Sequence, residues 1–364
     1  MVDLNSKVIV LQPVVPLYRE AFFRQLSSYV DLTIYTFYSK EFIQNNNMAS
    51  ANIKISNINS VSIGRAIFVN IIPFIFGNHK IVILCAEMKI LTNWLILIFG
   101  RVFGKKIILW GHGLNVKRYD YYKDKMPFIM KSLFRLADEA WFYTNNELKI
   151  WERIIPNLKS VSLNNTIDTT GIRKLDKNEK HALKSAYGIN QDIVLIFCAR
   201  FSNPNRRIDL LLKIMEQLEE NRFGFIILGD GVYKPDFSTF ENVYDFGSNY
   251  IRSKKNELFG ISDIYVQPAW TGLSIVEAMA YGKPVFTFER SNDIMQCVEY
   301  GYIKNGYNGI IFKSINEFVD YLNNCNHLDI NELGNNACAF VQKELSMDNM
   351  VLNAVKGIKM LKVS

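Results

Sequence analysis

Short apolar runs alternate with helical segments along almost the whole chain, and this alternation limits the fold more than any other feature of the sequence. Most runs are rich in β-branched or aromatic residues and are not interrupted by polar positions, which is typical of parallel strands covered on both faces. The ten runs are VIVLQP from Val8, LTIYTFY from Leu32, IVILCA from Ile81, IILW from Ile107, AWFYT from Ala140, VLIFCAR from Val194, FGFIILGDG from Phe223, VYDFG from Val243, DIYVQP from Asp263 and PVFTF from Pro284. The pattern predicts an α/β protein with two doubly wound parallel-sheet domains.

The chain length agrees with two domains, because 364 residues suffice for two hydrophobic cores of ordinary size. The boundary is expected near residue 180, in the polar stretch TTGIRKLDKNEKHALKSAYGINQD between a strand ending near Leu163 and the strand starting near Ile193. This predicts domains over 1–180 and 181–344. A final helix within 345–364 could pack back on the first domain.

Cysteines and apolar segments exclude several protein classes. The five cysteines are odd in number, far apart and without CxxC spacing, so neither a disulfide framework nor a zinc site is indicated and a reducing cytoplasm is expected. The apolar segment from Ile90 is interrupted by Arg101 before it reaches about 18 residues, which favours a helix and a buried strand over a membrane span. The amino-terminal residues indicate a first strand and not a signal peptide.

Positive charge is concentrated in one segment of a chain whose net charge is +7. Residues 101–135 carry nine Lys or Arg against two Asp, interleaved with Tyr, Phe, Ile and Met. Nucleic acid, a phosphorylated substrate and anionic lipid head groups are the candidate partners of such a segment. We favour peripheral binding to an anionic membrane, and the alternative is a solvated pair of helices without a partner.

The stretch PAWTGLSIVEAMAYGKPVF, residues 268–286, runs from a strand end through a loop into a helix starting near Leu273. Gly272 would let a ligand approach the backbone, and the free amides of the first helical turn, including that of Ser274, favour a phosphate. Glu277 lies on an apolar helix, so its carboxylate needs a partner, from the protein or from the paired hydroxyls of a ribose. The alternative is that Thr271 caps the helix and Glu277 bonds to backbone.

Three further strand-end loops carry candidate residues. In CARFSNPNRRIDLLL, Arg200 ends a strand and Arg206 precedes a helix, which suits a diphosphate clamp, whereas the neighbouring Arg207 is equally compatible with a surface turn. In IILGDGVYK, Gly229 and Gly231 allow close approach of a ligand or merely a tight turn.

The third loop, ILWGHGLNVKR, places His112 between two glycines at a strand end. There it could donate to a sugar hydroxyl or act as an acid or base, although a single histidine is more often structural.

Taken in order and spacing, these segments resemble a GT-B glycosyltransferase of the family 4 type. CARFSNPNRRIDLLL, IILGDGVYK, VYDFGSNYI and ISDIYVQPAWTGLSIVEAMAYGKPVF match its C-terminal half, and VPLYREAFFRQL, ILWGHGLN, LADEAWFYTNNE and LNNTIDTT match landmarks of its N-terminal half. The resemblance implies two Rossmann-like domains facing a cleft, a nucleotide-diphosphate sugar bound mainly by the second, and transfer with retention, with no cofactor and no obligatory metal.

The resemblance also assigns roles. Arg200 and Arg206 correspond to the basic pair on the diphosphate, Glu277 to the second glutamate of the E-x7-E motif, which holds the ribose, and His112 to a histidine near the donor sugar. The remaining donor-binding residues are Gly229, Gly231, Gly247, Trp270, Thr271, Gly272, Leu273 and Ser274.

Two departures from the family pattern are visible. Ala269 replaces the first glutamate of E-x7-E, so either the backbone amides of Trp270 and Thr271 recognise the sugar instead, or activity is weak or absent. The early Gly-Gly loop is replaced by Pro13-Val14-Val15-Pro16.

The predicted function is hexosyl transfer from a nucleotide sugar to a glycan or lipid-linked acceptor in cell-surface polysaccharide synthesis, in the cytoplasm at the inner face of the plasma membrane. The alternatives are a sugar-nucleotide epimerase of the same architecture, a non-catalytic nucleotide-sugar-binding protein and, least favoured, a nucleic-acid-binding module.

Overall fold

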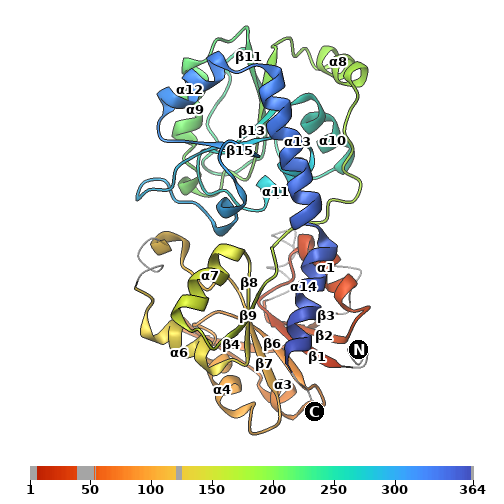
Figure 1. Ribbon diagram of the computed structural model, residues 1–364, viewed down its shortest axis with the longest axis vertical. Helices are drawn as coiled ribbons and strands as arrows, with labels where there is room; N and C mark the ends of the chain where they lie inside the picture. The colour runs from red at the N-terminus through yellow and green to blue at the C-terminus, as the bar shows by residue number, and fades with distance from the viewer. Residues whose placement is uncertain (1–5, 39–52, 54, 120–124, 362–364) are drawn as a thin grey trace. The chain divides into compact units, whose positions relative to one another are not determined.

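The computed structural model describes residues 6–38, 53, 55–119 and 125–361. The chain divides into two compact units (Figure 1): unit 1 comprises Met1–Asp168 and Met347–Ser364, and unit 2 comprises Thr169–Ser346. Residues 120–124, in the middle of the basic segment, and residues 362–364, at the end of the predicted final helix, lie outside the described residues.

Unit 1 contains a parallel sheet with the strand order β3-β2-β1-β6-β7-β8-β9. Its strands are β1 Lys7–Gln12, β2 Asp31–Thr36, β3 Ile55–Asn57, β6 Ile81–Cys85, β7 Lys106–Trp110, β8 Glu139–Phe142 and β9 Lys159–Ser162. A separate antiparallel hairpin is formed by β4 Ser60–Ile63 and β5 Ala66–Val69.

Helices cover both faces of the unit 1 sheet, and the strands alternate between two cores because successive side chains point to opposite faces. Ile9 and Leu11 of β1 pack with α4, α6 and α7, whereas Val8 and Val10 pack with α1 and α14. The helices are η1 Leu17–Arg19, α1 Glu20–Leu26, α3 Ile72–Phe76, α4 Leu91–Phe99, η2 Val116–Arg118, α6 Phe128–Leu136, α7 Asn145–Ile154 and α14 Met347–Met360. The C-terminal α14 lies beside α1 and on β9 (Figure 1).

Unit 2 contains a second parallel sheet with the order β12-β11-β10-β13-β14-β15. Its strands are β10 Ile193–Cys198, β11 Phe223–Leu228, β12 Val243–Asp245, β13 Ile264–Val266, β14 Val285–Phe288 and β15 Gly309–Phe312. Its helices are α8 Lys177–Ala186, η3 Pro204–Arg206, α9 Ile208–Gln217, α10 Arg252–Ile261, α11 Ser274–Ala280, η4 Val298–Tyr302, α12 Ile315–Asn324 and α13 His327–Glu344.

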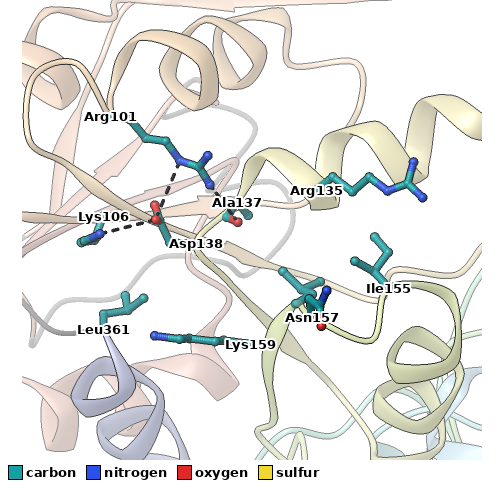
Figure 2. Close-up of a pocket in the computed structure, with 10 residues that line it drawn as sticks. Arg101, Lys106, Arg135, Ala137, Asp138, Ile155, Asn157, Lys159 and Leu361 are labelled. Carbon is teal, nitrogen blue, oxygen red and sulfur yellow. Dashed lines mark hydrogen bonds and ion pairs between the residues drawn. The ribbon is translucent and has the colours of Figure 1, made fainter.

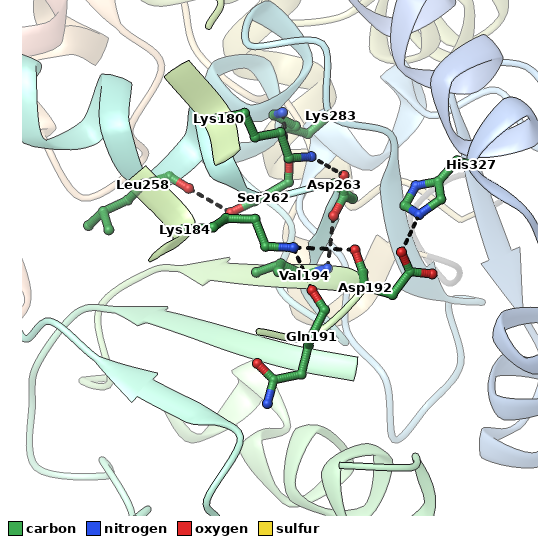
Figure 3. Close-up of polar contacts among 10 residues, drawn as sticks. All are labelled: Lys180, Lys184, Gln191, Asp192, Val194, Leu258, Ser262, Asp263, Lys283 and His327. Atoms are coloured by element: carbon green, nitrogen blue, oxygen red, sulfur yellow. Dashed lines mark hydrogen bonds and ion pairs between the residues drawn. The ribbon is translucent and has the colours of Figure 1, made fainter. Parts of the chain in front are cut away.

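The division between the units lies at Asp168–Thr169, before the position near residue 180 that the polar stretch predicts. The reason is that the segment around α8 forms polar contacts with unit 2. Lys180 forms an ion pair with Asp263, and the other carboxylate oxygen of Asp263 accepts a 2.9 Å hydrogen bond from the amide of Val194 (Figure 3). Nearby, Nζ of Lys283 donates to the carbonyl of Ser262 at 2.7 Å, and burial lowers the pKa of this lysine to about 8.

The α/β architecture with two doubly wound parallel sheets is confirmed, and each of the ten predicted runs contains a strand. The sequence analysis does not predict β3, the β4–β5 hairpin or β15. β4 has the sequence SVSI and leaves all four residues exposed, so it lacks the uninterrupted apolar run that marks the predicted strands. In the described part of the chain, no helix combines the length and apolarity required to span a bilayer.

Candidate functional site

A loop braced by a buried glutamine follows β13 in unit 2. Nε2 of Gln267 donates to the carbonyls of Ala269 and Trp270 at 3.2 and 2.7 Å. Its Oε1 accepts from the hydroxyls of Tyr265 and Ser274 at 2.7 and 2.9 Å. Ser274, predicted to lie near a ligand phosphate, therefore already directs its hydroxyl into the protein.

A second buried glutamine holds the other side of this loop. Oε1 of Gln296 accepts from the amide and the hydroxyl of Thr271 at 3.1 and 3.0 Å, while Nε2 donates to the carbonyls of Pro268 and Phe288 at 3.2 and 2.9 Å. Nε2 also donates to the hydroxyl of Thr287 at 3.0 Å, so Gln296 joins the loop to the end of β14. A buried polar side chain satisfied in this way specifies one loop conformation.

This bracing bears on the missing first glutamate of the E-x7-E motif. Ala269 is completely buried, and the amides of Trp270 and Thr271 donate to the carbonyl of Met295 and to Gln296. Those two amides are thus engaged and do not replace the absent carboxylate. Trp270 adopts a left-handed backbone conformation with φ of 56°, which is unusual for a bulky residue and is stabilised by these contacts.

The start of α11 is open. Leu273 is the N-cap residue, without a side-chain cap, so the alternative that Thr271 caps this helix is wrong. The amides of Gly272, Leu273 and Ser274 find no acceptor within the described residues. A Cβ at Gly272 would meet no atom within 4 Å, so a ligand has room beside this backbone.

Glu277 finds its partners in two cationic side chains of α10. Nζ of Lys255 lies 2.6 Å from Oε2 of Glu277, and Arg252 lies 3.2 Å from Oε1. The carboxylate is buried, so its charge requires this pairing. The alternative of bonds to backbone is wrong. Although burial alone would lower the pKa of Lys255, its interactions with Cys198 and Glu277 raise it above the usual value.

The basic residues Arg200 and Arg206 lie on the β10–α9 loop, which begins after Cys198. Arg200 is exposed, whereas Arg206 in η3 is partly buried and its Nε has no acceptor in the described part of the chain. Desolvation lowers the pKa of Arg206, and the charge of Arg200 acts in the same direction. Burial raises the pKa of the Cys198 thiol to about 12, and this thiol interacts electrostatically with Lys255, Glu277 and Arg206. Arg206 and Glu277 therefore both lie near Cys198.

Arg207 has a structural role. Its backbone is left-handed, its guanidinium grips Asp209 with two hydrogen bonds of 2.8 and 2.7 Å, and it donates to the carbonyl of Asp293 at 3.0 Å. Of the two neighbouring arginines, only Arg206 is available to a ligand.

The glycines of IILGDGVYK serve the packing of one loop on another. Gly229 and Gly231 have φ of 149° and 146°, and a Cβ at either would overlap the backbone of Ala199 or Phe201. Close approach by the chain's own backbone thus explains them without a ligand. Gly247 differs, because φ is 60° and a Cβ would meet nothing within 4 Å.

His112 lies in unit 1, on the loop after β7. Its flanking glycines are needed for packing, since a Cβ at Gly113 would overlap the Trp151 indole. The imidazole is exposed and lies edge-on to the ring of Tyr143 at 4.2 Å between centroids. Desolvation and the positive charge of Arg19 lower the pKa of His112 to about 4.

Several residues of these clusters escape sequence reasoning. Lys255, Gln267 and Gln296 lie in unremarkable sequence contexts, and only the apolar surroundings of Glu277 signal that a cation is needed. Arg19 is buried with its guanidinium 4.3 Å from the ring centroid of Trp110, and no carboxylate pairs with it among the described residues. No described group of three or more His, Cys, Asp or Glu side chains could hold a metal ion.

Residues 192–326, all within unit 2, match the family model of the glycosyl transferases group 1. This match includes Arg200, Arg206, Lys255, Glu277 and Gln296. It covers less than half of the chain. No curated protein sequence matches the chain.

Solved structures match over nearly the full length. Anabaena Alr3699/HepE in complex with UDP and glucose has a TM-score of 0.68 at 13% identity, covering 98% of this chain and 100% of that one. Sucrose-phosphate synthase from Thermosynechococcus elongatus has a TM-score of 0.67 at 12% identity, covering 98% and 99%. The chain has the GT-B fold. A Listeria monocytogenes protein provisionally named UDP-N-acetylglucosamine 2-epimerase shares it, with a TM-score of 0.57 at 13% identity, covering 98% and 96%.

A group 1 domain within a GT-B fold supports a glycosyltransferase that uses a nucleotide sugar. The finer assignments to family 4 and to its E-x7-E motif do not follow from these likenesses.

Proposed function

We propose that this GT-B protein transfers a hexose from a nucleotide-diphosphate sugar to a hydroxyl of a glycan or lipid-linked acceptor. The transfer proceeds with retention at the anomeric carbon and needs neither a cofactor nor an obligatory metal. The observation that carries the proposal is the cluster of Arg206, Lys255 and Glu277 around Cys198. It lies within the segment that matches the group 1 model.

The charges of this cluster suit a diphosphate beside a ribose. Arg252 and Lys255 pair with the single carboxylate of Glu277, and Arg200 and Arg206 add two further cations on the β10–α9 loop, so positive charge is in excess. Arg206 keeps a buried N–H without an acceptor in the described part of the chain, and an anionic oxygen would satisfy it. Lys255 and Arg252 orient the carboxylate of Glu277, which prepares it to accept hydrogen bonds from two ribose hydroxyls.

Negative charge grows on the diphosphate as the sugar leaves. Donors that are already in position stabilise this charge, and each contributes about 3 kcal/mol in comparable oxyanion sites. We assign this role to Arg200, Arg206 and the amides of Gly272 to Ser274. We assign to His112, in unit 1, a hydrogen bond to a substrate hydroxyl, because desolvation and the nearby charge of Arg19 lower the pKa of the imidazole to about 4 and leave it neutral at pH 7.

The place of action is also a proposal. We place the enzyme in the cytoplasm at the inner face of an anionic membrane, in cell-surface polysaccharide synthesis, because residues 101–135 combine basic and apolar side chains. Neither a metal nor nucleic acid is needed for this function.

A sugar-nucleotide epimerase is the competing candidate, because a provisionally named epimerase shares the fold. An epimerase converts its donor without an acceptor, so the two functions differ in one measurement. UDP, GDP, ADP and their sugars are first screened by thermal shift, where a ligand at 100 times its dissociation constant adds about 2.7 kcal/mol to stability. Conversion of the stabilising sugar nucleotide without added acceptor to its epimer would contradict transfer. If no nucleotide stabilises the protein, both candidates are wrong.

A further inference from the structure

A basic pocket lies in unit 1 at the amino ends of β7, β8 and β9, strands that are neighbours in the parallel sheet. Its volume is about 470 Å³. Its charged lining consists of Arg101, Lys106, Arg135 and Lys159 with a single carboxylate, Asp138 (Figure 2). The pocket therefore holds a clear excess of positive charge.

Internal contacts satisfy only part of this charge. Asp138 is shared, since Arg101 lies 3.8 Å and Lys106 3.7 Å from Oδ1 while Oδ2 accepts from the amide of Ile107. Lys159 donates to the carbonyl of Met360 at 2.9 Å. Arg135 has neither a hydrogen bond nor an ion pair within the described residues, and Figure 2 shows its side chain directed away from Asp138. Arg101 also donates to the carbonyl of Ala137 at 3.3 Å, so Arg135 is the lining cation whose charge is most available to an anion.

An exposed apolar surface on α4 adjoins the pocket. Leu91, Leu95, Ile98 and Val102 are spaced by four, three and four residues, so they lie on one side of α4 and of the turn after it. Ile98 is 50% exposed and Val102 80% exposed. We call these four residues the α4 face. Arg101 lies in the same turn as Val102 and lines the pocket, so cationic and apolar groups adjoin.

Cations of the basic segment differ in their availability. Lys105 is buried and donates to the carbonyls of Gly77 and His79. Lys117 and Arg118 are exposed in η2, after the carboxyl end of β7 and thus at the opposite end of the sheet from the pocket. Lys159, by contrast, lies outside the segment and joins the pocket through β9. The anion-binding group is therefore set by the fold and not by the linear basic run.

We propose that the pocket of Arg101, Lys106, Arg135 and Lys159 binds the phosphate group of an anionic phospholipid, with the α4 face resting in the head-group region of the bilayer. This proposal rests on the membrane partner proposed above and names its site. A membrane is favoured over a soluble phosphate compound because large aliphatic side chains, which water solvates poorly, stand beside the cations. Charge complementarity fixes the lipid as anionic.

The test is co-sedimentation of the full chain with vesicles of phosphatidylcholine containing about one-third phosphatidylglycerol. Arg101→Gln/Arg135→Gln removes two pocket charges and should weaken binding roughly 25-fold, since each basic residue near an anionic surface contributes about a fivefold factor. Val102→Ser should weaken it about fivefold by removing apolar contact. Lys117→Gln/Arg118→Gln is the charge-matched control. Val232→Ser is the apolar control, because the side chain of Val232 is 87% exposed in unit 2. Both controls should bind like the unchanged protein.

Three results would overturn the proposal. The first is that the pocket variant binds vesicles as well as the unchanged protein, and the second is that the Lys117→Gln/Arg118→Gln control loses as much binding as the pocket variant. The third is thermal stabilisation by inorganic phosphate together with undiminished vesicle binding by Val102→Ser, which would indicate a soluble anion. The thermal shift with UDP is measured on each variant. Vesicle binding without any nucleotide shift would contradict the transferase function and leave the pocket proposal standing, so the two failures are distinguishable.

Discussion

The ammonium group of Lys255 on α10 lies 2.6 Å from Oε2 of Glu277 on α11, and this pair joins two helices of unit 2 beside the loop that follows β13. Glu277 is buried, and Arg252 supplies a second cation to its other oxygen. The pair thus has two roles: it stabilises unit 2, and it orients a carboxylate where we place the ribose.

Glu277→Gln should reduce stability and ribose binding together. The substitution leaves Lys255 partly buried without its counter-charge, which costs about 2 to 4 kcal/mol. Chemical denaturation monitored by circular dichroism measures this loss. Glu257→Gln is the matched control, because Glu257 pairs with Lys254 at a more exposed position, and we expect a loss of about 0.5 kcal/mol there. Equal losses would show that the Glu277 pair has no special importance.

Gln296→Ala should loosen the loop over residues 268–271. It removes the acceptor of the Thr271 amide and the donor to the carbonyls of Pro268 and Phe288, so buried groups lose their partners at a cost of about 2 to 3 kcal/mol. Nucleotide affinity should fall as well, because the open amides of Gly272 to Ser274 follow this loop. Gln217→Ala, at an exposed site on α9, is the control. Unchanged affinity would mean that the loop does not position the ligand.

Restoring the missing carboxylate with Ala269→Glu should not create a better enzyme. Ala269 has no exposed surface, and a carboxylate there would be buried without a partner at a cost of several kcal/mol, on the order of 3. Ala269→Gln separates the effect of volume from that of charge. Increased transfer by Ala269→Glu in a coupled assay of nucleotide release would show that the braced loop has another conformation and would refute this interpretation.

Unit 1 should become less stable as the pH rises, because of the buried carboxyl group of Glu139. This carboxyl group on β8 is fully buried, and among the described residues only the Trp141 indole donates to it, at 2.6 Å; burial raises its pKa to about 7 from 4.5. Between these values the folded chain holds a proton that the unfolded chain has lost. The free energy of unfolding therefore falls as the pH increases through this window.

Glu139→Gln removes this titration. The difference in the free energy of unfolding, variant minus unchanged protein, should therefore increase by about 2 kcal/mol as the pH is raised from 5 to 8. Urea denaturation followed by tryptophan fluorescence reports on unit 1, which contains four of the five tryptophans. Glu216→Gln, exposed on α9, controls for the substitution itself. A constant difference across the pH range would contradict the raised pKa.

Sequence reasoning succeeds where a local pattern carries the information. Runs such as VLIFCAR and FGFIILGDG contain β10 and β11 because uninterrupted apolar residues are needed between two helical layers. β4 is missed because its exposed residues have no such requirement. The same logic predicts that Glu277 needs a partner, since an isolated buried carboxylate is costly.

The identity of that partner depends on packing between distant segments. Lys255 precedes Glu277 by 22 positions, and only the packing of α10 and α11 brings them together. Gly229 and Gly231 show the converse case, because a pattern typical of ligand-binding loops is here also required by contact with the β10 loop. Pairings of this kind are tertiary, so a single sequence does not encode them in any local pattern.

Isothermal titration of UDP, GDP and ADP into the unchanged protein and into Arg206→Gln tests the donor site most directly. We predict that one nucleotide binds the unchanged protein and that Arg206→Gln weakens its binding about 10- to 100-fold, since a charged hydrogen bond to phosphate is lost. Arg207→Gln is the control. It should change nucleotide binding little, because the guanidinium of Arg207 is already occupied by Asp209. Binding that is undiminished in Arg206→Gln, or binding of no nucleotide by the unchanged protein, would contradict the account.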